Sequence, residues 1–162
     1  MIKEILFLSV DQMKRIKPSL DTVVVSILDA SERAHRPRLA GFKSVLCLEF
    51  EDTYEEIKLA GEGAWPDEPT DVEHARFAQG RGERIPTLTD ARAIVEFVQR
   101  HQECPEEVTL IAHCFGGISR SAAVAVWTSV RYWIPIANAN MRSTDGANKR
   151  LMRLMDKAAG RR

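Results

Sequence analysis

Apolar runs alternate with polar segments along this chain, and the pattern predicts strands and helices in turn. Three short apolar runs rich in β-branched residues are predicted as strands over residues 5–10, 22–28 and 42–50. A fourth strand, over 108–112, leads into a loop with two adjacent glycines and then into a long run of small and apolar residues. Strands interleaved with helices favour an α/β domain, a three-layer sandwich with a mainly parallel central sheet.

The predicted helices follow from apolar positions spaced three and four residues apart. Residues 88–101 have this spacing, with Thr87 or Thr89 as the cap and Asp90 in the first turn. Shorter helical segments are expected at 11–16, 54–60, 72–78 and 137–142. The pattern therefore places one long amphipathic helix directly before the fourth strand.

Two further helices follow the glycine loop. The first, about 120–133, is apolar nearly all round, which predicts a buried helix. The second, about 147–159, is amphipathic, and Asn148 is expected either to cap it or to tie it to the loop. Its basic side chains are expected on the solvated face: Lys149, Arg150, Arg153 and Lys157. Trp127, Tyr132 and Trp133 are expected to pack in the core or at the helix end.

Composition limits the class of protein. A chain of 162 residues with 44% apolar content favours a single domain over residues 1–162. The formal net charge is zero, which gives no support for a nucleic-acid or membrane partner. The N-terminus is too short and too charged for a signal peptide, and three cysteines do not make a disulfide framework. We therefore expect a cytoplasmic protein.

The candidate chemistry is concentrated between Val108 and Ser121, in the sequence VTLIAHCFGGISRS. A glycine loop that feeds a helix N-terminus binds anions, and a cysteine at its start is placed to be a thiolate nucleophile. Arg120, which follows Cys114 after five intervening residues, can hold two phosphate oxygens. The backbone N–H groups that would cradle the phosphate belong to Phe115, Gly116, Gly117, Ile118 and Ser119.

Two neighbours of this loop are expected to support the thiolate. The Ser121 hydroxyl would hydrogen-bond the sulfur and help it to leave, and the His113 ring would hydrogen-bond nearby backbone. No cofactor is predicted. No metal is predicted either, because the sequence has no cluster of His, Asp or Glu at ligand spacing.

The run His113 to Ser121, HCFGGISRS, resembles the signature of cysteine-dependent protein tyrosine phosphatases. Its Ser-Arg-Ser ending and its position late in the chain are most similar to the dual-specificity branch and its small bacterial relatives. The resemblance implies a dual-specificity-phosphatase-like fold and hydrolysis through a phosphocysteine on Cys114. The implied substrate is a phosphotyrosine-containing protein or a small phosphomonoester. It also implies an aspartic acid that protonates the leaving group and then activates water.

The identity of that acid stays open at the level of sequence. In dual-specificity relatives it follows a strand, at an offset that falls here near Glu83, where there is no aspartate. Asp52 is the first candidate because it ends the third predicted strand, and an insertion over 53–86 would explain the long gap. Asp67 is second, since it stands in the Trp-Pro-Asp tripeptide of classical tyrosine phosphatases. The remaining alternatives are that the acid is Asp71 or Glu83, or that the protein has no general acid.

Other readings compete with a protein phosphatase. A catalytically weak module would bind phosphate or phosphotyrosine without cleaving it. A phosphatase of a non-protein phosphomonoester is also possible, although the uncharged loop argues against a polyanionic substrate, and a rhodanese-type sulfurtransferase is a distant fourth.

His35, His74 and His101 are expected to be solvated, Cys47 to be in the core and Cys104 at or near the surface. Either of these two cysteines is a candidate resolving partner if Cys114 oxidises.

Overall fold

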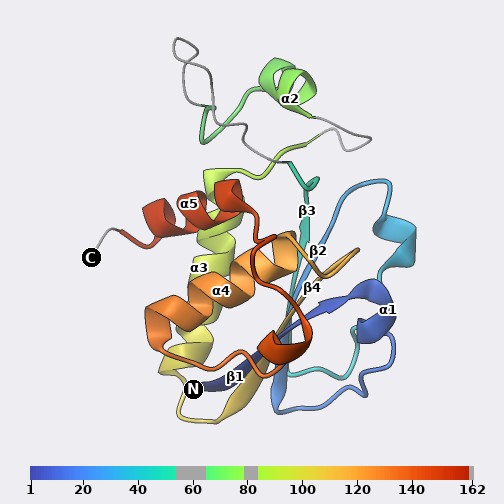
Figure 1. The fold of residues 1–162 in the computed structure, drawn as a ribbon, viewed down its shortest axis with the longest axis vertical. Helices are drawn as coiled ribbons and strands as arrows, with labels where there is room; N and C mark the ends of the chain where they lie inside the picture. The colour runs from blue at the N-terminus through green and yellow to red at the C-terminus, as the bar shows by residue number, and fades with distance from the viewer. Residues whose placement is uncertain (54–64, 79–83, 161–162) are drawn as a thin grey trace.

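A parallel sheet organises the chain. In a computed structural model, residues 1–53, 65–78 and 84–160 are described, and they form an α/β domain. Four strands, all parallel, lie in the order β1–β4–β2–β3 (Figure 1). Their bounds are β1 (Ile2–Ser9), β2 (Thr22–Leu28), β3 (Ser44–Glu49) and β4 (Val108–Cys114). Because the strands are parallel, their carboxyl ends meet at one edge of the sheet.

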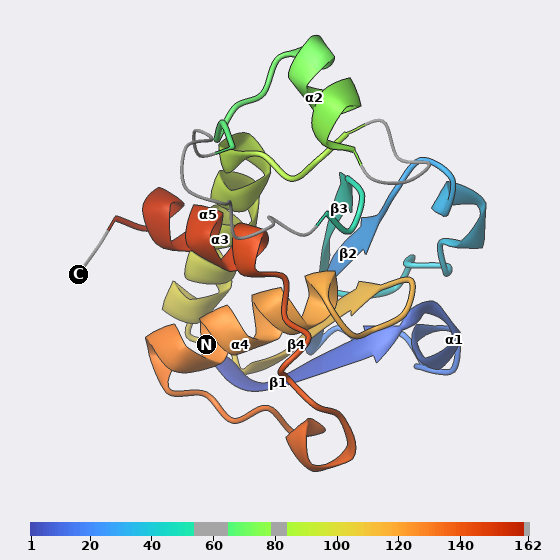
Figure 2. The ribbon, with the colours of Figure 1, turned by 45° about the horizontal axis from the view of Figure 1, so that its top comes forward.

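The two faces of the sheet are covered unequally. Three helices, α3 (Leu88–Glu103), α4 (Arg120–Tyr132) and α5 (Lys149–Ala158), lie on one face (Figures 1 and 2). Their apolar sides join the strands in the main core. The other face carries the short helix α1 (Val10–Met13) and a smaller cluster made by Leu8, Met13, Val24, Phe42 and Ile111. This arrangement is compatible with a three-layer sandwich that has one thin outer layer.

Three shorter elements complete the described part: η1 (Arg33–His35), α2 (Asp71–Phe77) and η2 (Ala139–Met141). The α2 helix stands beyond the end of β3 (Figure 2) and is capped by Thr70, whose side chain accepts a hydrogen bond from the backbone of Glu73. The helix expected at 54–60 lies outside the described residues, as does part of the expected insertion at 53–86. No helix in the described ranges is long and apolar enough to cross a membrane.

The strands and longer helices overlap the predicted ranges, but β1 begins three residues before its predicted start and β4 continues two residues further, to Cys114. Thr87 is the cap of α3: its side chain accepts from the backbone N–H of Asp90, whose carboxylate accepts from Thr87 in return at 2.8–2.9 Å. Thr89 instead donates to Glu68. Asn148 caps α5 by accepting from Leu151 N–H at 3.0 Å. The local signals for helix starts were thus sufficient at both positions.

The prediction of a solvated basic face on α5 is wrong for Arg150, which is fully buried. Its guanidinium donates to the carbonyls of Pro86 (3.0 Å) and Pro66 (2.7 Å) and lies over the Trp65 ring. The segments around residues 65–67 and 84–88 therefore cover this side of the helix, and arginine satisfies their backbone carbonyls there.

Three other expectations from sequence are also wrong. Cys47 is exposed, because β3 is an edge strand whose residues are only partly covered. His101 is buried, with its ring against Phe97 at 4.7 Å. Trp133 is 92% exposed; it is the residue that ends α4, and it has a left-handed backbone conformation (φ 58°).

Candidate active site

The glycine loop lies at the carboxyl edge of the sheet, where open α/β folds bind ligands. β4 is an inner strand between β1 and β2, and it ends at Cys114, which is paired with Ser9 of β1. The next five residues connect β4 to α4, which begins at Arg120. The strand, the loop and the N-terminus of a 13-residue helix are thus arranged as an anion site requires.

The thiol has a hydroxyl neighbour. Cys114 is 1% exposed, and its sulfur lies 3.2 Å from the Ser121 hydroxyl oxygen. Ser121 is itself fully buried in the first turn of α4. A hydroxyl at this distance can donate to a thiolate and stabilise it.

The loop needs glycine at Gly117, where φ is +65°. A Cβ at this residue would stand 2.3 Å from the backbone nitrogen of Ser9, so no side chain fits. Two apolar side chains of the loop are exposed, Phe115 (45%) and Ile118 (59%). The Phe115 ring meets His35 edge-on at 5.6 Å. The mouth of the loop is therefore apolar and partly aromatic.

Arg120 is buried and held from two sides. Nη1 donates to the Phe50 carbonyl at 2.9 Å, and Nη2 donates to both carboxylate oxygens of Glu32 at 2.9 and 3.1 Å. Among the described residues, its buried Nε has no partner. A buried guanidinium N–H without a protein acceptor is a donor left for an anionic ligand. The sequence analysis did not identify Glu32, which lies in the connection after β2.

Asp52 is hydrogen-bonded directly to the loop. Its Oδ1 accepts from the Ser119 hydroxyl at 2.6 Å and from Asn148 Nδ2 at 2.9 Å. The same Nδ2 donates to the Thr53 carbonyl at 3.0 Å. Asn148 thus caps α5 and also ties it to the site, so both roles considered for it from sequence are present.

Asp67 is held elsewhere. Its carboxylate accepts from Arg153 at 2.7 Å and from Lys157, both on α5. Partial burial favours the protonated acid, but the hydrogen bonds from Lys157 and Arg153 outweigh it and lower the pKa of Asp67. Asp71 is exposed in the first turn of α2, and Glu83 lies outside the described residues. Of the candidate acids that the structure describes, only Asp52 has a hydrogen bond to the loop.

Within the residues that the structure describes, His113 does not make the expected hydrogen bond to backbone. It is fully buried, and neither ring nitrogen has a partner within the described part of the chain. Burial, with the positive charges of Arg36 and Arg120, lowers the pKa of His113 to about 4. The ring is therefore neutral near pH 7 and is buried in β4, directly before Cys114.

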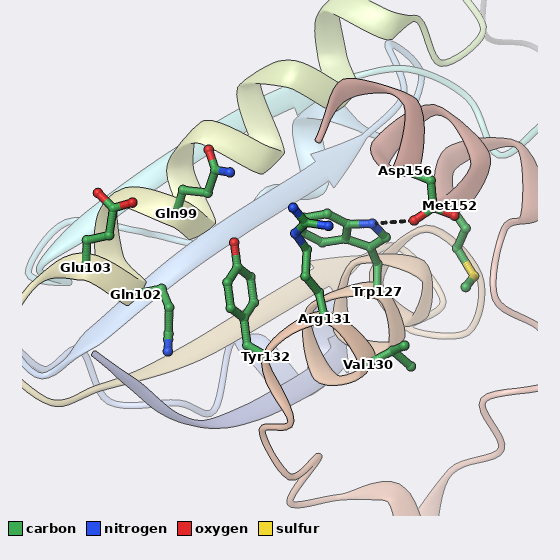
Figure 3. Close-up of a pocket in the computed structure, with 9 residues that line it drawn as sticks. All are labelled: Gln99, Gln102, Glu103, Trp127, Val130, Arg131, Tyr132, Met152 and Asp156. Atoms are coloured by element: carbon green, nitrogen blue, oxygen red, sulfur yellow. Dashed lines mark hydrogen bonds between the residues drawn. The ribbon is translucent and has the colours of Figure 1, made fainter. Parts of the chain in front are cut away.

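A separate cavity of about 520 Å³ lies between α3, α4 and α5 (Figure 3). It is lined by the last turns of α4, including Trp127, whose indole donates to Asp156 at 2.9 Å. None of the loop residues lines it. In the described ranges, no three His, Cys, Asp or Glu side chains are grouped as metal ligands. The cavity is therefore separate from the glycine loop at the carboxyl edge of the sheet.

Comparison of the chain with protein-family models, with curated proteins and with solved structures finds no match. Any assignment of function therefore depends on the residues of the site itself.

Proposed function

We propose that this protein is a cysteine-dependent phosphomonoester hydrolase of the protein tyrosine phosphatase type, similar to the dual-specificity branch. The observation that carries the proposal is a buried thiol 3.2 Å from a hydroxyl, in a loop that ends at a buried arginine with one N–H unpartnered among the described residues. A nucleophile, an anion cradle and a charge clamp thereby occupy one short segment.

In the first step, Cys114 sulfur attacks phosphorus in line with the leaving oxygen. The S–P bond forms as the ester P–O bond breaks, and the electron pair of that bond goes to the leaving oxygen. Asp52 gives this oxygen a proton. Arg120 and the loop N–H groups stabilise the negative charge on the three equatorial oxygens.

In the second step, water attacks the phosphocysteine and gives a proton to the Asp52 carboxylate. The S–P bond breaks, inorganic phosphate is released and the electron pair returns to sulfur. The Ser121 hydroxyl donates to the departing thiolate, which makes it a better leaving group. The contact of Asp52 with Ser119 supports this role, since it holds a carboxylate at the rim of the loop.

The mouth of the site favours an aryl phosphate. Phe115 and Ile118 are exposed beside the loop, and an aromatic ring can pack on such a surface. Two arginines in the connection after β2 are already engaged, since Arg33 pairs with Glu49 and Arg36 donates to Ser26 and Leu48. We therefore place phosphotyrosine in proteins first among substrates, ahead of polyanionic phosphomonoesters. The carboxylate at the loop favours turnover over a module that only binds phosphate.

Hydrolysis of p-nitrophenyl phosphate in the presence of EDTA tests the proposal. We expect vanadate-sensitive turnover by the wild type and complete loss of turnover in Cys114→Ser. Cys47→Ser is the matched control, because Cys47 is an exposed cysteine on an edge strand. Turnover that persists in Cys114→Ser contradicts the proposal, as does a wild type that releases no phosphate from any aryl phosphate.

A further inference from the structure

Alternate carbonyls of the glycine loop are hydrogen-bonded from outside the loop. Each acceptor has a donor from a different part of the chain. The pairs are Phe115 O with Val10 N–H (3.1 Å), Gly117 O with Arg142 Nη1, and Ser119 O with Asn148 N–H (3.2 Å). The loop is therefore fixed at every second peptide group.

This pattern sets the direction of the intervening N–H groups. In a trans peptide the C=O and the following N–H point to opposite sides, and the described residues contain no cis bond. Anchored carbonyls at 115, 117 and 119 thus turn the N–H groups of Gly116, Ile118 and Arg120 away from the anchors. A phosphate held by Arg120 would lie on the side of the loop opposite the anchors, where it would accept hydrogen bonds from these N–H groups.

Gly117 is the weakest point of this arrangement. Glycine adopts positive and negative φ with similar ease, so the peptide group that follows it has little intrinsic preference of orientation. At Gly117 the donor is the side chain of Arg142, whereas the other two anchors are backbone N–H groups. Arg142 is therefore the one anchor of the three that a substitution can remove directly.

Arg142 is itself held in position. Its second Nη donates to Gln12 Oε1, which also accepts from Ser9 N–H at 3.0 Å. Farther along the same connection, a Cβ at Gly146 would stand 2.9 Å from Ile118 Cγ2, so the chain packs closely on the loop there. The connection from residue 142 to 148 thus contacts three consecutive loop residues, 117 to 119.

We propose that Arg142 is a positioning residue that holds the phosphate-binding loop in its anion-accepting conformation. The role rests on the proposed function, since it concerns the same loop. Arg142 acts through the Gly117 carbonyl and needs no contact with the substrate. Without it, the peptide group between Gly117 and Ile118 can rotate, and the site loses a preorganised donor.

The test compares Arg142→Met with Arg100→Met, an equal loss of charge at an exposed position near the far end of α3. We expect KM for p-nitrophenyl phosphate and the inhibition constant of inorganic phosphate to rise together by about tenfold in Arg142→Met only, as for loss of one charge-assisted hydrogen bond. Arg142→Lys should be intermediate, because an ammonium cannot bridge Gly117 and Gln12 in the same fixed geometry.

A second measurement does not depend on turnover. In a background lacking Cys47 and Cys104, we measure the alkylation rate of Cys114 by iodoacetamide against pH, with and without phosphate. Arg142→Met should move the midpoint of alkylation to higher pH and weaken protection by phosphate. Gln12→Leu should do the same to a smaller extent, and adding it to Arg142→Met should change little further.

The outcomes separate this inference from the proposed function. A wild type without turnover overturns the proposed function, and the alkylation data still decide the role of Arg142. Alkylation and phosphate protection in Arg142→Met that equal those of Arg100→Met overturn the inference, whatever Cys114→Ser shows. If Arg142→Met does not fold, the same comparison is made with Arg142→Lys and Gln12→Leu.

Discussion

The ion pair between Glu32 and Arg120 permits a quantitative test of the electrostatics of the site. The Arg120 side chain is 4% exposed and that of Glu32 is 18% exposed, with a closest N–O distance of 2.9 Å. A second pair, Arg33 with Glu49, is shorter at 2.6 Å, but its side chains are 67% and 36% exposed. The variants Glu32→Gln and Glu49→Gln remove the same charge from a buried and an exposed pair.

The expected losses of stability differ because of burial. Breaking a buried pair costs about 3–5 kcal/mol, since the remaining charge is left without compensation. Glutamine keeps one oxygen acceptor for Arg120 and the site is slightly open to water, so we expect about 2–3 kcal/mol for Glu32→Gln. An exposed pair contributes about 0.2–1 kcal/mol, so Glu49→Gln should lose no more than that.

Thermal and urea unfolding, followed by circular dichroism, measure both losses. For a chain of this size, each kcal/mol lowers Tm by about 2–4 °C, so Glu32→Gln should melt about 5–10 °C below the wild type. Its kcat/KM should also fall, because Arg120 loses the contact that fixes its fork. Equal destabilisation by the two variants would refute the reasoning, since burial would then not decide the strength of the pair.

Two further predictions concern the acid and the buried histidine. Asp52→Asn should lower kcat by about 10²–10⁴-fold for phosphotyrosine peptides and by less for esters with acidic leaving groups. Asp67→Asn should change kcat by no more than a few fold. Equal values of kcat for the two variants would exclude Asp52 as the general acid. The pKa of His113 is about 4 in the folded protein and about 6.5 in the unfolded chain. Below about pH 6.5 the unfolded chain therefore binds a proton that the folded protein does not, and the free energy of unfolding falls by up to about 3 kcal/mol as the pH is lowered to 4. Urea unfolding of His113→Phe at pH 5 and pH 7 should show a smaller acid destabilisation than the wild type does, and an unchanged difference would contradict the role of His113.

The sequence predicted those features that depend on neighbours along the chain. The strand, loop and helix around Cys114 are contiguous, and Ser121 follows Cys114 by seven residues, so the local pattern was enough to bring the sulfur and the hydroxyl together. The capping box at Thr87 is equally local. Arg150 was mispredicted because amphipathic spacing describes only the side of a helix that faces the main core. The covering segments around residues 65–67 and 84–88 are distant in sequence.

Glu32 was missed for a similar reason. It is 88 residues from Arg120, and it lies in a charged stretch that is typical of a solvated loop. The sequence did contain one indication that Glu32 lies near the site. Glu32, Asp52 and Cys114 each lie at or soon after the end of a predicted strand. In a parallel sheet such positions meet at one edge. The positions at strand ends therefore identify Glu32 and Asp52 as candidates for the site. Which carboxylate contacts Arg120 depends on the order of the strands, and the hydrophobic pattern does not determine that order.

The contacts of the two aspartates support the proposal that Asp52, and not Asp67, is the general acid. A general acid must carry a proton when the leaving oxygen departs and must lose it in the transition state. Asp67 bonds to two cations, Arg153 and Lys157, which stabilise its anion and lower its pKa. Asp52 instead accepts hydrogen bonds from Asn148 and from Ser119, and Ser119 belongs to the loop that would hold the phosphate. The Trp-Pro-Asp tripeptide, although it matches classical phosphatases in letters, therefore has the contacts of a structural ion pair in this fold.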